Sequence, residues 1–151
     1  MKISDIVNGI SIKIDAEFPN ATIYTEKIPQ GFSEPCFVIK MINLEDIKRM
    51  KGRWLVRPMF NIMYFPSNNG GSTECYDVSL ELQHALQEIE LIDETIMLST
   101  SSNTKIVDGE DGDVVAHNFM NFNFFLQDIK HEDFMESLQQ YINKQRVNVI
   151  G

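Results

Sequence analysis

The spacing of apolar residues near the start of the chain predicts an amphipathic helix over about Ser4–Glu17. Apolar residues recur three or four positions apart, at Ile3, Ile6, Val7, Ile10, Ile14 and Phe18. This spacing places them on one helical face. Ser4 or Asp5 is the expected N-cap. Gly9 costs about 1 kcal/mol of helix propensity, so this helix is expected to depend on packing.

Continuous and alternating apolar runs predict a sheet. The expected strands are Ile23–Thr25, Cys36–Ile42, Trp54–Phe65, Thr95–Leu98, Lys105–Val107 and Val114–Leu126. The polar segment Asn43–Gly52 is interpreted as a loop. Pro58 falls inside a strand, and since proline cannot donate to a ladder, it indicates an edge position or a bulge.

Two more helices are expected, and together the elements define the fold class. The first covers Glu74–Glu90 and has an inner stripe of Cys75, Val78, Leu82, Leu86 and Ile89. The second covers Glu132–Gln145, has Phe134, Leu138, Tyr141 and Ile142 on one face, and precedes an apolar tail at Val147–Ile150. The order α-β-β-β-α-β-β-β-α predicts an α+β fold, a mostly antiparallel sheet with amphipathic helices packed on it. Residues 1–151 are expected to form a single domain.

Composition supports a folded domain outside membranes. The chain is 43% hydrophobic and contains 10 Phe, enough for a core without disulfides or metals at this length. No apolar run approaches the ~18 residues that span a bilayer. The first residues lack the apolar stretch of a signal peptide, so we expect synthesis and folding in a cytoplasm.

Charge is unevenly distributed along the chain. The net charge of −9 argues against a general nucleic-acid binder, which needs basic surface to neutralise phosphates. Basic residues crowd at Lys48, Arg49, Lys51, Arg53 and Arg57, and none occurs from Pro58 to Thr104, where Glu74, Asp77 and Glu81 lie. Solvated faces are the ordinary interpretation. The sharper hypothesis is a subunit interface in which a basic edge meets an acidic edge, since head-to-tail contacts close into rings.

A second acidic cluster, Asp108–Asp113, has the sequence DGEDGD and is expected at a hairpin tip. Its carboxylates are Asp108, Glu110, Asp111 and Asp113. The cluster lacks the ligand order of a calcium-binding EF-hand. Four acids without nearby cations are costly to bury, so we expect the loop to face solvent or the lumen of a ring.

No pattern indicates catalysis, a cofactor or a metal. Cys36 and Cys75 are far apart and are interpreted as reduced, buried thiols. The histidines His84, His117 and His131 lie on separate expected elements, and His117 is interpreted as a half-buried structural residue. The Gly-rich segment at residues 70–73 precedes a helix but has no Lys for a phosphate. The Phe-rich run 119–125 could stack nucleobases, but acidity favours sheet core.

Several short segments together resemble one family. They are Ile23–Glu26 (IYTE), Gln30–Phe32 (QGF), Glu34–Phe37 (EPCF), Tyr64–Pro66 (YFP) and Glu74–Tyr76 (ECY), following the first amphipathic helix in this order. The series is similar to the tail-terminator proteins of siphophages and prophages of Gram-positive bacteria. It covers most of the chain.

The resemblance implies an α+β virion protein that assembles as a ring, typically a hexamer, on the growing tail tube. Such a ring would stop polymerisation of the tube protein and present a surface to the head-side connector, with DNA only passing through its lumen. The family implies no catalytic, cofactor or metal residues. Another neck or tail-completion protein, a small cytoplasmic hydrolase and a ligand-binding domain are the alternatives left open.

Overall fold

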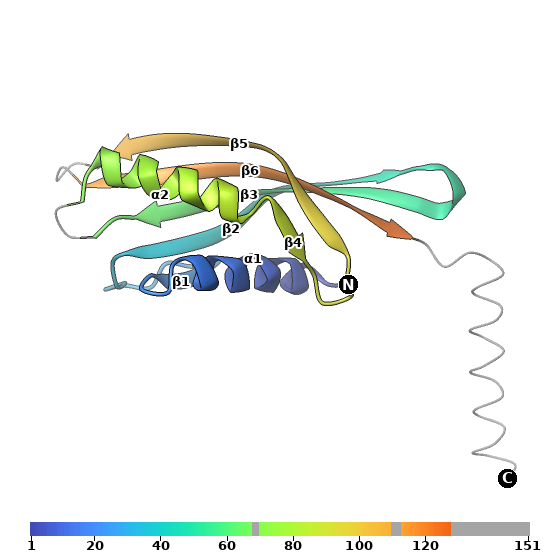
Figure 1. Ribbon diagram of the computed structural model, residues 1–151, viewed down its shortest axis with the longest axis horizontal. Helices are drawn as coiled ribbons and strands as arrows, with labels where there is room; N and C mark the ends of the chain where they lie inside the picture. Colours follow the sequence, from blue (N-terminus) through green and yellow to red (C-terminus); the bar gives the residue numbers. More distant parts are fainter. Residues whose placement is uncertain (68–69, 110–112, 128–151) are drawn as a thin grey trace, which may run out of the picture.

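One curled sheet with two helices on the same face makes up the described part of the protein. The computed structural model describes residues 1–67, 70–109 and 113–127. The elements are α1 (Ile3–Glu17), β1 (Thr22–Thr25), β2 (Cys36–Lys48), β3 (Arg53–Phe65), α2 (Ser72–Ala85), β4 (Glu88–Glu90), β5 (Ile96–Asp108) and β6 (Val114–Gln127), with a short 3-10 turn at Met50–Gly52. The strand order is β1-β2-β3-β6-β5-β4. Only the β1–β2 pair is parallel, so the predicted α+β class with a mostly antiparallel sheet is confirmed (Figure 1).

The hydrophobic core lies between this sheet and both helices. Ile6, Ile10 and Ile14 of α1 are buried in the same cluster as Leu82 of α2. The sheet contributes Phe37, Ile39, Val56, Phe60, Ile62, Tyr64, Ala116, Met120, Phe122 and Phe124. Core-facing residues alternate along the two long strands β3 and β6, and of the Phe-rich run Phe122 and Phe124 lie in the core.

Helix α1 agrees with its prediction except at its first residue. Lys2, not Ser4 or Asp5, is the N-cap. Asp5 instead accepts a hydrogen bond from the Lys2 backbone N–H (2.8 Å). A Cβ at Gly9 would lie 2.9 Å from Leu91 Cδ2 and 3.2 Å from Ile89 Cγ2. The missing side chain therefore lets α1 approach β4 closely, and this packing offsets the propensity cost.

Helix α2 is shorter than predicted. The expected helix Glu74–Glu90 is wrong after Ala85, because Glu88–Glu90 is a strand that pairs with Ile96–Leu98. Leu86 and Ile89 are buried as expected. Apolar residues three or four positions apart can continue from a helix into the following strand, because residues of both elements are buried in the same core. The spacing alone therefore does not show where the helix ends.

The sheet is more extended than predicted. Asn43–Lys48 was expected in a loop but continues β2 past a bulge at Ile42, so β2 and β3 form one long hairpin. The two weak strands at Thr95–Leu98 and Lys105–Val107 are one strand, β5, because the Ser/Thr-rich residues between them pair with β6.

The edge interpretation of Pro58 is wrong, since β3 lies inside the sheet. The β3–β6 pairing is interrupted at Arg57 and Pro58 without a change of register, and the bulge is in the neighbouring strand β2. A missing amide therefore interrupts a central ladder locally.

The C-terminal predictions lie outside the described residues. These are the helix Glu132–Gln145, the tail Val147–Ile150 and His131. Within the described part, no helix has the length and apolar character needed to cross a membrane.

Candidate functional site

The predicted basic residues lie on the β2–β3 hairpin, which extends beyond the helices at one end of the molecule (Figure 1). Lys48, Arg49, Lys51, Arg53 and Arg57 are all exposed. The turn is tight, because Arg49 N–H donates to Arg53 O (2.6 Å) and Lys51 has φ 61°. Met50 at the tip is 82% exposed. The hairpin therefore presents cations around an apolar side chain.

Few contacts with other described residues engage these cations. Arg57 lies 3.8 Å from Glu45, and an ion pair this exposed contributes little. Arg53 lies over the Phe125 ring, 4.2 Å from its centroid, a cation–π contact. Among the described residues, neither Arg49 nor Lys51 has a carboxylate partner within 4.0 Å. Within the described part of the chain, the tip is thus a cationic surface without a counterion at Arg49 and Lys51.

The predicted acidic residues of α2 differ in their surroundings. Asp77 is exposed. Glu81 lies beside Glu17 of α1, where a hydrogen bond between the two carboxyl groups, then burial and repulsion, raise the pKa of Glu81. Glu74 is half-buried and accepts hydrogen bonds from Ser67 N–H (3.1 Å) and Ser67 Oγ (2.8 Å). Asp77 and the Glu17–Glu81 pair therefore form the exposed acidic surface, and Glu74 stabilises its own loop.

The Glu74 carboxylate also bears on the Gly-rich loop before α2. A Cβ at Gly70 would clash with Glu74 Oε2. Because a carboxylate occupies the space beside Gly70, this loop is not an attractive site for an anion.

The described ends of the acidic Asp108–Asp113 segment lie where β5 and β6 pair as a hairpin, in agreement with the prediction. Asp108 pairs with Val114, and Gly109 N–H donates to Asp113 O. Asp108 and Asp113 are exposed, whereas Glu110 and Asp111 lie outside the described residues. The β5–β6 hairpin ends at the opposite end of the molecule from the β2–β3 hairpin (Figure 1).

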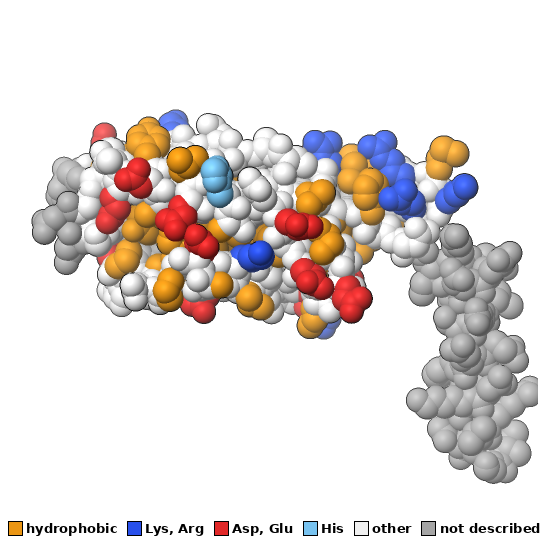
Figure 2. Space-filling view, viewed as in Figure 1, with side chains coloured by type: hydrophobic (Ala, Val, Ile, Leu, Met, Phe, Trp, Pro, Cys, Tyr) orange, Lys and Arg blue, Asp and Glu red, His pale blue; other side chains and the backbone are white. Residues whose placement is uncertain are grey.

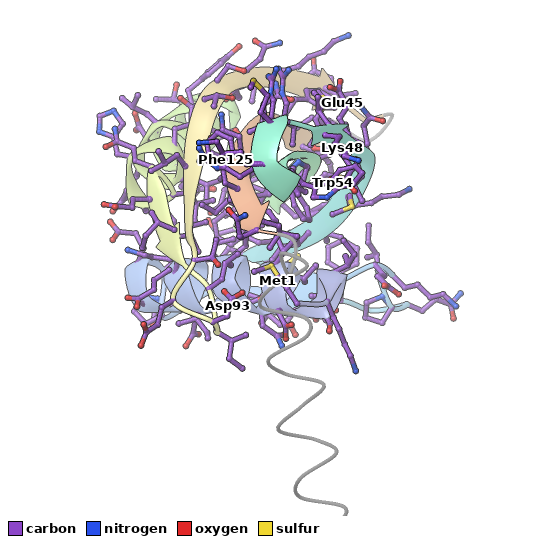
Figure 3. All side chains as sticks on the ribbon, turned by 90° about the vertical axis from the view of Figure 1, so that its right-hand side faces the viewer. Met1, Glu45, Lys48, Trp54, Asp93 and Phe125 are labelled. Carbon is purple, nitrogen blue, oxygen red and sulfur yellow. The ribbon has the colours of Figure 1, made fainter. Side chains whose placement is uncertain are left out.

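Charge is consequently separated along the long axis of the subunit. Figure 2 shows most of the visible Lys and Arg side chains gathered at the β2–β3 end, with isolated ones elsewhere, and acidic side chains spread over the remainder of the visible face. One acidic group, the turn with Asp93, lies at the same end as Met1 (Figure 3). The arrangement leaves a cationic tip distant from the α2 acids of its own subunit.

An apolar surface that sequence reasoning missed lies beside α1. Ile12 is 70% exposed and Ile92 is 80% exposed. They line a groove of about 490 Å³ between α1 and the segment after β4. The available signal was Ile12 itself, an apolar residue off the inner stripe of the predicted helix.

Three titratable groups, His117, Cys36 and Cys75, are buried or half-buried inside the fold. His117 is half-buried, its Nδ1 lies 3.0 Å from Asn61 Nδ2, and burial followed by repulsion from Lys105 lowers its pKa. Cys36 and Cys75 are buried free thiols. Burial, then the Glu34 charge, raises the pKa of Cys36 to about 11, and burial raises the pKa of Cys75. In the parts of the chain that the structure describes, no cluster of His, Cys, Asp or Glu could hold a metal ion.

We expect both thiols to resist alkylation by iodoacetamide at pH 8 in the folded protein. Only the thiolate reacts, and a pKa of about 11 leaves little Cys36 thiolate at that pH. Mass spectrometry should detect labelling only after denaturant is added. EDTA and dithiothreitol should leave the melting temperature unchanged. Rapid labelling of the native protein would contradict the assignment of Cys36 and Cys75 as buried thiols. A fall in melting temperature of several degrees with EDTA or dithiothreitol would instead reveal a metal site or a disulfide.

Comparisons with known proteins assign the chain to a family. The family described as "Phage tail terminator protein" matches residues 5–134 of the chain. The chain belongs to the phage tail terminator family. The match spans most of the chain, so the terminator is a virion tail component of a structural protein family.

A solved structure supports the fold of the terminator. The similar protein carries only a reference number as its name and is 12% identical, with a TM-score of 0.57 over 82% of this chain and 96% of that one. At this identity the similarity concerns the fold alone. No curated protein matches the chain.

Proposed function

We propose that the terminator caps the phage tail tube as a homo-oligomeric ring. The ring, expected to be a hexamer, ends addition of tube protein and presents its other face to the head-side connector. DNA only passes through its lumen. The role is structural rather than enzymatic, and the subunit is made in the host cytoplasm before it joins the tail.

The separation of charge supports this proposal in addition to the family match. A basic hairpin lies at one end of the subunit, and its tip residues Arg49 and Lys51 have no carboxylate partner among the described residues. The exposed acids Asp77 and Glu81 lie on α2. A surface that binds a different surface of an identical copy makes a heterologous contact, and such contacts close into rings when the rotation permits. Because the two surfaces carry opposite charge, each subunit can attract the next.

Capping follows from the asymmetry of such a ring. Its two faces differ, since every subunit points the same way round. One face can match the end of the tube while the other does not match a further tube ring, and growth then ends.

Two measurements test the proposal. Native mass spectrometry and negative-stain imaging of the purified chain should reveal one closed oligomer. Added to polymerising tube protein, the chain should halt elongation at substoichiometric amounts, because one ring per tube is enough. A protein that stays monomeric at all concentrations and leaves tube growth unchanged would refute the function.

The acidic hairpin tip is expected to be dispensable for assembly. Replacing Asp108, Glu110, Asp111 and Asp113 with Ser should leave folding and the oligomer mass nearly unchanged, since the flanking acids are exposed. If the tip lines the lumen, its charge keeps the passing phosphates from adhering. The variant's defect should then appear in the yield of infectious particles. Failure of the variant to fold would show that these carboxylates are buried and paired.

A further inference from the structure

Apolar side chains lie uncovered where the sheet extends past the start of α1. They form a groove of about 170 Å³ lined mainly by Met1, Ile3, Ile6, Leu44, Val56 and Leu126. Val56 in its floor is 6% exposed, whereas Met1, Ile3 and Leu44 at its rim are 45%, 43% and 44% exposed. α1 begins only at Ile3, so it cannot cover this part of the core-facing side.

We propose that the C-terminal segment of the same chain, Glu132–Gln145, folds back and docks on this groove. The sequence of that segment predicts an amphipathic helix with Phe134, Leu138, Tyr141 and Ile142 on one face. A helix of this length is marginal alone in water, so its apolar face needs a partner. The groove is an apolar surface of the same chain in need of a cover.

The place where β6 ends favours this occupant. Leu126 is itself a wall of the groove, and β6 ends at Gln127. Residues 128–131 then span up to about 14 Å when extended, which is sufficient for a reversal of direction. A short tether also gives the segment an effective concentration in the millimolar range. The groove is similar in size to a cavity of about 150 Å³ that accepts a benzene ring, so one ring or branched side chain fits.

Charge favours the same arrangement. The predicted helix begins with Glu132 and Asp133, followed one turn later by Glu136. Gln127 Nε2 donates to Lys51 O (3.1 Å), so the chain leaves the described structure beside the basic tip. The acidic first turn then lies within reach of cations that have no carboxylate partner in the described part. The family match ends at residue 134, so most of this helix is a feature of the chain beyond that match.

A disulfide test in the full-length chain distinguishes the outcomes. Leu44→Cys combined with Leu138→Cys should form an intrachain bond on mild oxidation. At about 10 µM protein, a millimolar effective concentration favours the intrachain product about a hundredfold. Leu44→Cys with Gln140→Cys is the matched control, because residue 140 falls on the opposite face of the predicted helix. Cys36 and Cys75 are buried and should stay reduced.

The pattern of products decides the proposal. Efficient intrachain bonding at 138 and little at 140 supports docking. Equal bonding at both positions means a tethered but undocked segment, mainly interchain bonding means exchange between copies, and no bonding means that the segment lies elsewhere. Each of these three results overturns the proposal.

Trp54 gives a second, independent measurement. It is the chain's single tryptophan, it is half-buried, and it pairs with Leu126 on the groove side of the sheet. Figure 3 looks onto this end and labels Met1 and Trp54 there. Leu138→Asp should shift Trp54 emission to longer wavelength, whereas Gln140→Asp should not. Identical spectra for the two variants would contradict docking at this groove.

Discussion

Reversing Arg49, Lys51 and Arg53 to Glu is expected to dissociate the ring without unfolding the subunit. All three side chains are exposed at the hairpin tip, so the fold loses little beyond the contact of Arg53 with Phe125, worth about 0.5–1 kcal/mol. At the interface the change replaces attraction by repulsion, which costs several kcal/mol. A loss of about 3 kcal/mol is roughly a hundredfold in affinity. Native mass spectrometry should find monomers at concentrations where the parent chain is a closed oligomer.

The matched control carries the same change of net charge elsewhere. Lys13, Lys27 and Lys105 are exposed and lie away from the hairpin, so their reversal to Glu should preserve the oligomer. Raising the salt concentration should weaken the parent ring by screening. If the hairpin variant keeps its oligomer mass, the basic tip does not contact a neighbouring subunit.

A charge-swap tests the partner surface. Replacing Asp77 and Glu81 by Arg in the hairpin variant should restore at least part of the ring, because the attraction is re-formed with the signs exchanged. Asp77→Arg and Glu81→Arg in the parent chain should weaken the ring. Absence of any rescue would place the acidic partner elsewhere on the subunit.

The fold was predictable where burial imposes one period on the sequence. The inner stripe of α1 and the alternation in β3 and β6 have strong apolar patterns, since one side of each element faces the core. The pattern is weak where strands extend past the helices. Asn43–Lys48 belongs to β2 although it is polar, because pairing with β3 rather than burial holds it. β4 was missed because its only buried residue, Ile89, also fits the period of the preceding helix.

The candidate site was predictable as charges but not as geometry. The basic segment was visible in the sequence, and exposure of its members followed from their charge. The basic segment projects from the body because it lies on the β2–β3 hairpin. The polar sequence of Asn43–Gly52 had instead indicated a loop. The hydrogen bonds that Glu74 accepts from Ser67 could not be predicted from the sequence either, because they depend on the conformation of the loop before α2. Sequence patterns report burial well and loop closure poorly.

Phe122→Ala is expected to be among the most destabilising single changes in the protein. Phe122 is 1% exposed, and its ring meets the Phe60 ring edge-on with centroids 6.1 Å apart. It lies on the side of β6 against which both helices pack. Truncating a buried Phe to Ala costs about 3–5 kcal/mol through lost burial and the cavity that remains. For a chain of this size that lowers the melting temperature by about 10 °C.

Phe125→Ala is the matched control on the same strand. Phe125 is 49% exposed on the opposite side of the sheet, and the Arg53 guanidinium lies over its ring. Its loss should lower stability by no more than about 1 kcal/mol. Thermal unfolding followed by circular dichroism compares the two variants directly. Since the substitution is chemically the same, the difference must come from the surroundings of the two rings. Equal melting temperatures for Phe122→Ala and Phe125→Ala would mean that the core does not lie on the helix-bearing face of the sheet.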